Sequence, residues 1–340
     1  MTVTEMAKDR SHPDQYRRNS RSFGISHVWK RAVICAALSA LPLVAGAEGW
    51  PRSVPHEAGE LTLKQVPERI VSTTPSVTGI LLAIDAPVIA SAATAQGPLT
   101  DDKGFFSQWA EVADQRGVQP LYPDLQFDIE AIIGAAPDLL IASANGGDSV
   151  MQFYPEIEAL GLPALVVDYS THSWQDIARQ LGRATGHEAE AEAAIKRFDS
   201  HAAKAAANMT LPKGKATIVG YNIAGSYSVG RPESPQAQVL TALGFDIVPI
   251  PDDMQGEITR SSNFDFVSRE NLSAAIPGET VFLMSGSDED VQAFMDDPVL
   301  ANHPAVKAGR VYPLGRSSFR IDYYSGLQMI DKVAGQFGTP

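Results

Sequence analysis

Two arginines and several aromatic residues lie close together near the end of the chain. The segment GRSSFRIDYYSGLQMIDK places Arg316 and Arg320 on either side of Phe319. A guanidinium group donates hydrogen bonds in one plane and stacks on aromatic rings. The segment therefore either stabilises the local fold, with Arg320 paired to a carboxylate such as Asp322 or Glu270, or it binds a ligand that is flat and negatively charged.

Other side chains could extend such a site. Arg231 follows a predicted strand, and Arg260 lies in the polar segment GEITRSSN. Tyr221 and Tyr227 flank a glycine-containing turn, and Phe106 lies where a loop of the first half leads into a predicted helix. For each of these arginines, contact with a ligand and exposure as an ordinary surface charge are both open, and the same holds for Tyr227.

The first 47 residues differ in composition from the rest of the chain. Basic residues precede the apolar run AVICAALSALPLVAG, which ends at the small-residue site Ala45-Gly46-Ala47. This order predicts a secretory signal peptide over residues 1–47 that is cleaved on export. A membrane anchor fits less well because a span needs ~20 apolar residues. Whether export uses the general or the twin-arginine route stays open.

The charge of the exported chain limits its partners. The 340 residues contain 27 Lys and Arg and 40 Asp and Glu, a formal net charge of −13. Loss of residues 1–47, with seven basic and three acidic residues, leaves 20 basic and 37 acidic residues and a charge of −17. Nucleic acid is not expected as a partner, because its phosphates need a basic face. The exported chain has no cysteine, since Cys35 is the only one, which excludes thiolate metal sites and cysteine catalysis.

Strands and helices alternate along the chain. VPERIVSTTPSVTGILLAIDAPVIA is typical of a strand, a turn, a helix and a second strand, and PALVVDY has the continuous apolar run of a parallel strand covered on both faces. The spacing is helical from Ser173 to about residue 210, with Ser173 as N-cap and Gly186 as a break or kink. In the second half, ENLSAAIPGETVFLMS resembles EAIIGAAPDLLIAS of the first, and HPAVKAGRVYPL resembles WAEVADQRGVQPL.

These patterns predict an α/β fold of two similar lobes, each with a mainly parallel sheet, joined by one long rigid helix. A ligand would bind in the crevice where the strand ends of the two lobes face each other. The predicted parts are an N-terminal tail (48–67), an N-terminal α/β lobe (68–172), a connecting helix (173–210) and a C-terminal α/β lobe (211–340).

The sequence lacks the motifs of common enzymes with this architecture. It has no G-x-S-x-G elbow, and RIVSTTPSVTG lacks the G-x-G-x-x-G of a dinucleotide site, so we expect a binding protein and not an enzyme. Binding of a bare metal ion such as Zn²⁺ stays an alternative, although it needs converging histidines and carboxylates and HEAGE has only one histidine. Haem, held by Tyr221 or Tyr227, and cobalamin also stay open.

Four segments make the chain similar to a known family. RIVSTTPSVTGILLAIDAPVIASAAT, DDKGFFSQWAEVA, PDLLIASANGGDS and FRIDYYSGLQMIDK follow in this order. They resemble the periplasmic substrate-binding proteins of iron-siderophore ABC importers, most closely those for ferric enterobactin. The similarity extends from about Glu68 to near the C-terminus and implies the helical-backbone form of the two-lobed fold.

The resemblance implies a monomeric periplasmic protein that captures a ferric catecholate siderophore and delivers it to an inner-membrane ABC permease. It implies no cofactor, no catalysis and no direct bond from protein to iron, because the siderophore already fills the coordination shell of the metal. Such a complex carries three negative charges. We therefore expect arginines to gather at the cleft, each charge-assisted hydrogen bond contributing roughly 1.5–3 kcal/mol.

The resemblance also implies individual site residues. The family pair that matches Phe319-Arg320 lines the ligand cleft, and Glu233 is the candidate in the second lobe for the glutamate that docks on the transporter. Two departures leave the siderophore open between enterobactin, a related catecholate and a smaller mixed-ligand compound: Pro98 stands where an arginine is expected, and Arg231 lies where a tryptophan is expected. The predicted ligand-binding residues are Arg320, Phe319, Arg316, Arg231, Arg260, Tyr227, Tyr221 and Phe106.

Overall fold

The computed structural model describes residues 49–255, 259–261 and 263–338. The predicted signal peptide and Cys35 therefore lie outside the described residues. All of the described residues fall in one compact unit. Within the described part of the chain, no helix has both the length and the apolar character that crossing a membrane requires.

The N-terminal lobe is built on a five-stranded sheet in the order β5-β4-β3-β6-β7. Every neighbouring pair is parallel, as predicted. Successive residues of β3 point to opposite faces, so Ile70 packs into one buried cluster and Val71 into another. Burial on both faces explains the continuous apolar runs. The strands are β3 (Ile70–Ser72), β4 (Val88–Ser91), β5 (Gln119–Pro120), β6 (Leu139–Ser143) and β7 (Ala164–Val167), and the helices are α1 (Pro75–Ala83), α2 (Ser107–Gln115), α3 (Ile129–Ala135) and α4 (Tyr154–Ala159).

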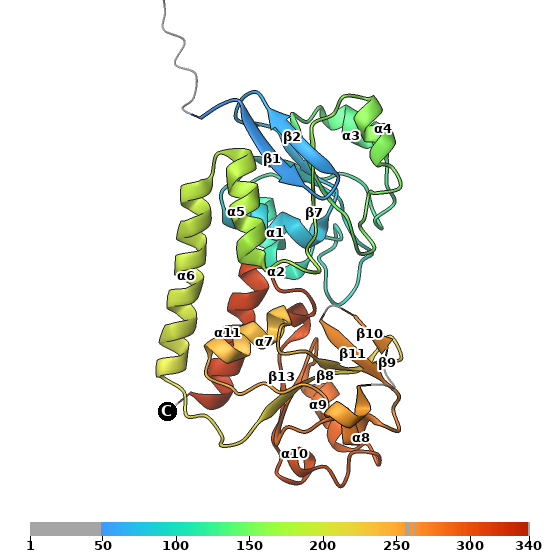
Figure 1. Ribbon diagram of the computed structural model, residues 1–340, viewed down its shortest axis with the longest axis vertical. Helices are drawn as coiled ribbons and strands as arrows, with labels where there is room; N and C mark the ends of the chain where they lie inside the picture. Colours follow the sequence, from blue (N-terminus) through green and yellow to red (C-terminus); the bar gives the residue numbers. More distant parts are fainter. Residues whose placement is uncertain (1–48, 256–258, 262, 339–340) are drawn as a thin grey trace, which may run out of the picture. The chain divides into compact units, whose positions relative to one another are not determined.

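The predicted N-terminal tail is wrong, because most of residues 48–67 form a hairpin. Strands β1 (Arg52–His56) and β2 (Gly59–Leu63) pair antiparallel. Val54 of β1 and Leu63 of β2 are buried. The backbone N–H of Glu57 donates to the Val166 carbonyl of β7 at 3.0 Å, which fixes the turn to the lobe. Figure 1 shows this hairpin beside β7.

The C-terminal lobe has a six-stranded sheet in the order β10-β11-β9-β8-β12-β13. The α/β class is confirmed, but only β8, β12 and β13 are parallel, and the other three pairs are antiparallel. The difference arises at Ala224 and Gly225, a two-residue loop between β8 and β9 in which both φ angles are positive. Such a loop matches a type I′ turn and sends the chain straight back. The strands are β8 (Ala216–Ile223), β9 (Ser226–Gly230), β10 (Thr259–Arg260), β11 (Phe264–Val267), β12 (Thr280–Leu283) and β13 (Val311–Pro313), and the helices are α7 (Pro235–Ala242), η1 (Asp252–Met254), α8 (Leu272–Ala275), α9 (Asp288–Met295) and α10 (Pro304–Lys307).

The internal similarity holds for one pair of segments and fails for the other. EAIIGAAPDLLIAS forms α3 and β6, and ENLSAAIPGETVFLMS forms α8 and β12, each strand lying beside the strand that comes first along the chain in its sheet. WAEVADQRGVQPL and HPAVKAGRVYPL also form a helix and a strand each. Their strands, however, hold different places: β5 pairs with β4, whereas β13 pairs with β12 and so takes the place that β7 has in the first lobe.

The predicted single connecting helix is two helices, α5 (Trp174–Thr185) and α6 (Glu188–Ala207). Ser173 accepts a hydrogen bond from the Asp176 backbone and is the N-cap, as predicted. Gly186 ends α5 at a φ of 78°, a left-handed conformation that glycine adopts without strain. Helix α5 packs on the N-terminal lobe through α1 and β1, while α6 contacts elements of both lobes.

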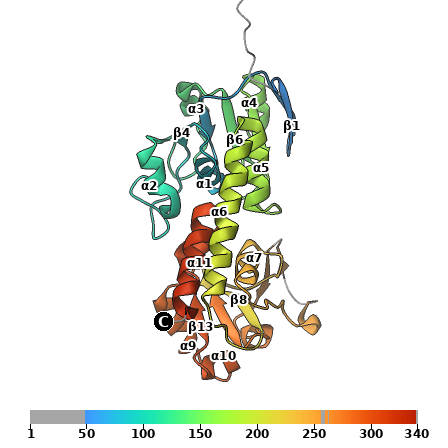
Figure 2. The ribbon, with the colours of Figure 1, turned by 90° about the vertical axis from the view of Figure 1, so that its left-hand side faces the viewer.

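A second helix also contacts both lobes. Helix α11 (Tyr323–Phe337), which follows the 3-10 turn η2 (Arg316–Phe319), packs against α6 and α7 and against α1 and α2. Figures 1 and 2 show α11 beside α6. Trp174 of α5 joins them, with its ring centroid 5.1 Å from that of Phe198 on α6 and 5.7 Å from that of Tyr323.

Asp322 caps α11 where the two lobes meet. Its carboxylate accepts from the Ser325 backbone at 2.8 Å and from the Gln108 side chain of α2 at 3.4 Å. Helix α1 comes so close that a Cβ added at Gly79 would lie 2.6 Å from Oδ2 of Asp322. Asp322 is fully buried, and this burial raises the pKa of its carboxyl group.

Candidate functional site

A cleft between the lobes lies beside Arg320. A first hollow of about 360 Å³ is lined mainly by the N-terminal lobe and also by Phe319 and Arg320. A second hollow of about 130 Å³ shares Ser76, Tyr169, Phe319 and Arg320 with the first and extends to β11 and α7 of the C-terminal lobe. We refer to the two hollows together as the interlobe cleft. It lies at the carboxyl ends of the N-terminal strands, as expected for a parallel sheet.

Arg320 is held by aromatic rings. Its guanidinium carbon lies 4.0 Å from the ring centroid of Tyr169 and 5.7 Å from that of Phe319. Among the described residues it has no ion pair with a carboxylate, and its buried Nε has no hydrogen-bond partner. The predicted alternative of a pair with Asp322 or Glu270 is therefore not what the structure shows. A cation of this kind is available to an anionic ligand.

Tyr169 is fixed in turn by Asp148. The phenol of Tyr169 donates to Oδ1 of Asp148, and the hydroxyl of Thr74 donates to Oδ2 at 2.5 Å. Asp148 is only 7% exposed. Burial and, after it, the nearby Asp148 raise the pKa of Tyr169 to about 12, while Arg320 acts in the opposite direction. Sequence reasoning missed both residues, although Asp148 follows β6 within the segment GGDS and so lies at the edge where ligands bind.

Two other predicted residues lie in or beside the cleft. Phe106, at the start of α2, lines the first hollow. Arg316 lies beyond the loop that carries Pro98 and Leu99, in a side hollow of about 300 Å³ that also contains Lys332. Its guanidinium group is 3.4 Å from the hydroxyl of Ser287. Arg316 is therefore next to the interlobe cleft and does not line it.

The structure does not bring Arg231 and Arg260 into the cleft. Arg260 on β10 pairs at 3.0 Å with Asp265, whose side chain is buried. Arg231 lies 3.6 Å from Glu233 and donates to the Ser261 carbonyl at 3.5 Å. Both guanidinium groups already have a negatively charged neighbour, so neither matches the unpaired arrangement of Arg320.

Tyr221 and Tyr227 belong to the packing of the C-terminal lobe. Their ring centroids are 5.5 Å apart, and Tyr221 also meets Phe294 edge-on at 5.2 Å. The Tyr221 phenol donates to Asp297 at 2.8 Å, and Arg269 pairs with the same carboxylate at 2.8 Å. Burial and the hydrogen bond to Asp297 raise the pKa of Tyr221. Neither tyrosine lines the interlobe cleft.

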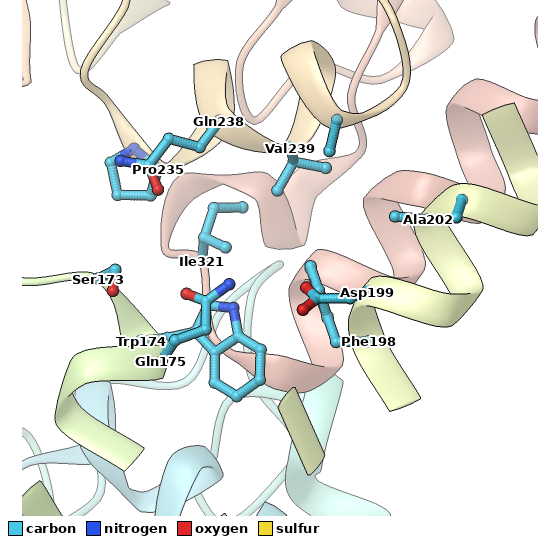
Figure 3. A pocket seen from close by; sticks show the side chains of 12 residues that line it. Ser173, Trp174, Gln175, Phe198, Asp199, Ala202, Pro235, Gln238, Val239 and Ile321 are labelled. Atoms are coloured by element: carbon cyan, nitrogen blue, oxygen red, sulfur yellow. The ribbon is translucent and has the colours of Figure 1, made fainter. Parts of the chain in front are cut away.

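A further hollow of about 310 Å³ shares Trp174, Pro235 and Ile321 with the second hollow of the cleft. In the view of Figure 3, Ile321 is drawn between Trp174 and Val239 of α7, with Asp199 of α6 at one side. The lining is largely apolar, and Nε1 of Trp174 has no hydrogen-bond partner. None of the predicted site residues lines it.

Side chains for direct metal binding are not grouped together in the part of the chain that the structure describes. No three His, Cys, Asp or Glu residues there lie close enough to hold an ion. His172 lines the second hollow, and its exposed ring lies near the Asp168 carbonyl. The chemistry that the cleft offers is one unpaired guanidinium group among aromatic faces and hydroxyl groups.

Comparison with known proteins gives a consistent result. A family described as periplasmic binding protein matches residues 70–317. The chain is 40% identical over 304 residues to the ferric enterobactin-binding periplasmic protein FepB of Escherichia coli O6:H1 (strain CFT073), which covers 88% of this chain and 95% of that protein. It is 24% identical over 262 residues to the Fe(3+) dicitrate-binding periplasmic protein FecB of Escherichia coli K12, covering 76% of this chain and 80% of that protein.

Solved structures agree with this result. The crystal structure of holo-ViuP matches with a TM-score of 0.77 and 38% identity, covering 85% of this chain and 96% of that one. Staphylococcus aureus SirA complexed with staphyloferrin B matches with a TM-score of 0.66 at 18% identity, covering 84% and 98% of the two chains. At that identity the second match shows the fold alone.

Proposed function

The chain belongs to the periplasmic binding protein family, and from this premise we propose that it captures a ferric siderophore of the catecholate class, with ferric enterobactin as the first candidate. It then delivers the complex to an inner-membrane ABC permease for iron uptake. It acts as a carrier and not as an enzyme. It works as a monomer in the periplasm, after cleavage of residues 1–47.

The observation that supports this proposal most directly is the unpaired guanidinium group of Arg320 in the interlobe cleft. The oxygens of a ferric catecholate complex are negatively charged and accept the hydrogen bonds that Arg320 can donate. The rings of Phe319 and Phe106 offer flat apolar surface to the catechol rings. Iron needs no protein ligand, because the siderophore surrounds it.

The number of unpaired cationic side chains at the cleft bears on the charge of the siderophore complex that it can bind. A trianionic complex would gain from a second cation, and Arg316 lies just beyond Pro98 and Leu99, whereas Lys332 beside it is 3.7 Å from Asp288. Arg231 and Arg260 are already paired, so we do not assign them a ligand contact. A mixed-ligand siderophore with fewer charges is therefore the second candidate, favoured by the single unpaired arginine that lines the described cleft.

A titration with different ligands tests the function. Trp174 lines the second hollow, so its fluorescence should report binding there. Ferric enterobactin, a ferric mixed-ligand siderophore, haemin, cobalamin and Zn²⁺ are compared on the exported chain. We expect the tightest binding to a ferric catecholate, with a dissociation constant at or below about 1 µM, equivalent to about 8 kcal/mol. Tighter binding of haemin, cobalamin or Zn²⁺ would contradict the proposal.

Delivery requires a surface that the permease recognises, and we propose Glu233 as part of it. Its side chain is 68% exposed and lies just before the N-cap of α7. Glu233→Gln should leave siderophore affinity within about twofold but slow iron uptake in cells that depend on this protein, because a charge at the rim of an interface acts mainly on association. Glu279→Gln, an exposed charge at the amino end of β12, is the control. Equal uptake with both variants would remove Glu233 from the docking surface.

A further inference from the structure

Arg320 is held differently from three other arginines of the C-terminal lobe. Arg231, Arg260 and Arg269 each lie beside a carboxylate. Arg320 instead lies over the face of Tyr169 at 4.0 Å, and its own charge is not cancelled by a direct partner among the described residues. Since Arg320 comes from the C-terminal lobe and Tyr169 from the N-terminal lobe, the contact joins the two.

The tyrosine is itself built into a prepared position. Its phenol donates to Asp148, and Asp148 accepts a second hydrogen bond from Thr74 at 2.5 Å. The loop before Asp148 leaves room for the phenol because residue 146 is glycine. A Cβ at Gly146 would lie 1.6 Å from the Tyr169 oxygen, and its φ of 79° is one that glycine tolerates best. The position of the ring is therefore set by several independent contacts.

We propose that Tyr169, anchored by Asp148, is a positioning residue that holds the guanidinium group of Arg320 in the interlobe cleft while leaving its charge and its hydrogen-bond donors free for the siderophore. This inference rests on the proposed function. It assigns a binding role to two residues that make no ion pair with Arg320. Asp148 does not touch Arg320; it holds the phenol of Tyr169, and the ring of Tyr169 in turn holds the guanidinium group.

The physical reason lies in what each kind of partner does to an arginine. A carboxylate in direct contact would occupy the N–H donors and cancel the charge that must attract the ligand. An aromatic face attracts the cation through its negative face and leaves the edge of the guanidinium plane open. A phenol that donates to a carboxylate has a more electron-rich ring, which strengthens this attraction. Holding a long side chain in place before the ligand arrives also lowers the entropy cost of binding.

A mutant cycle with ferric enterobactin as the probe tests the proposal. Tyr169→Leu removes the ring and should weaken binding at least about fivefold, whereas Tyr169→Phe keeps the ring and should weaken it only about twofold. The double variant of Tyr169→Leu with Arg320→Ala should bind no more weakly than Arg320→Ala alone, because both changes remove the same interaction. Tyr122→Phe removes another buried phenol of the same lobe and is the control.

A second measurement needs no ligand. In ¹H–¹⁵N NMR spectra of the free protein, the Nε proton of Arg320 should be shifted upfield by the Tyr169 ring. The shift should persist in Tyr169→Phe and vanish in Tyr169→Leu. Gly146→Ala should displace the phenol and reduce the shift, whereas Gly147→Ala should not, because the nearest atom to its added Cβ is 3.7 Å away.

The outcomes separate this inference from the proposed function. Additive losses in the double variant, or an Arg320 signal that Tyr169→Leu leaves unchanged, would overturn the positioning role. If the unmodified protein binds no ferric siderophore, the proposed function fails, and the NMR measurement still decides whether Tyr169 holds Arg320. A normal Arg320 signal in the unmodified protein would likewise end the inference.

Discussion

Arg320→Ala is expected to weaken the binding of ferric enterobactin at least tenfold. The variant removes the unpaired guanidinium group of the interlobe cleft, and the loss of a single charge-assisted hydrogen bond of roughly 1.5–3 kcal/mol is enough for such a change. The rings of Tyr169 and Phe319 stay in place, so apolar contact with the ligand persists. The measurement is a fluorescence titration checked by calorimetry at one fixed salt concentration, since exposed charges are screened by salt.

Arg310→Ala is the matched control for this experiment. Arg310 is also partly exposed, but it lies just before β13, at the amino end of the strand, and is 3.7 Å from Glu279. Its loss should change the dissociation constant less than twofold. If Arg320→Ala binds as tightly as Arg310→Ala, the siderophore does not use Arg320, and the assigned site is misplaced.

Asp322→Ala is expected to lower the free energy of unfolding by about 2–4 kcal/mol. It removes the cap of α11, which leaves the Ser325 N–H without its buried acceptor at a cost of roughly 1–3 kcal/mol, and it removes the hydrogen bond from Gln108, worth about 1 kcal/mol. Because Asp322 also touches Gln108 of α2 and lies against Gly79, the loss affects the contact between the lobes. Urea denaturation followed by circular dichroism measures the change.

Asp322→Asn separates the loss of the cap from the loss of the charge. Asparagine keeps an acceptor for Ser325, so the variant should lie within about 1 kcal/mol of the unmodified protein. Burial raises the pKa of Asp322 in the folded state. The carboxyl group therefore contributes most to the stability of the fold below its unfolded pKa, and this contribution is lost as the pH rises through the folded pKa. The free energy of unfolding of the Asn variant should therefore rise relative to that of the unmodified protein as the pH rises. A constant difference across pH would show that the carboxyl pKa is not raised.

Local patterns predicted the parts of the fold that local forces decide. The continuous apolar strands of the N-terminal sheet and the Ser173 N-cap depend on neighbouring residues, and both are found. The break at Gly186 was visible as a glycine, but whether the chain bends or turns back there depends on what α5 packs against. The hairpin of β8 and β9 depends on a positive φ at Ala224, and an alanine in the sequence does not predict a positive φ.

The site shows the same division. Phe319 and Arg320 were predicted from a motif within one segment, and both line the interlobe cleft. Tyr169 and Asp148 were not predicted, because Tyr169 meets Arg320 across the lobes and Asp148 meets Tyr169 from another loop of the same lobe, and no spacing in the sequence reveals either contact. For Arg231, by contrast, the sequence does show the neutralising partner, because Glu233 follows only two residues later. Closeness in sequence alone does not decide whether a carboxylate pairs with an arginine, however. Asp322 follows Arg320 equally closely and instead caps α11.

Two helices, α6 and α11, run side by side and contact both lobes. Helix α6 has neither proline nor glycine over its 20 residues, so it offers no ready point for bending. Empty and loaded carriers would then differ little in outline. A permease would have to distinguish them by the part of the bound chelate that is exposed between the lobes. Chelates with a similar exposed part would then be transported equally well.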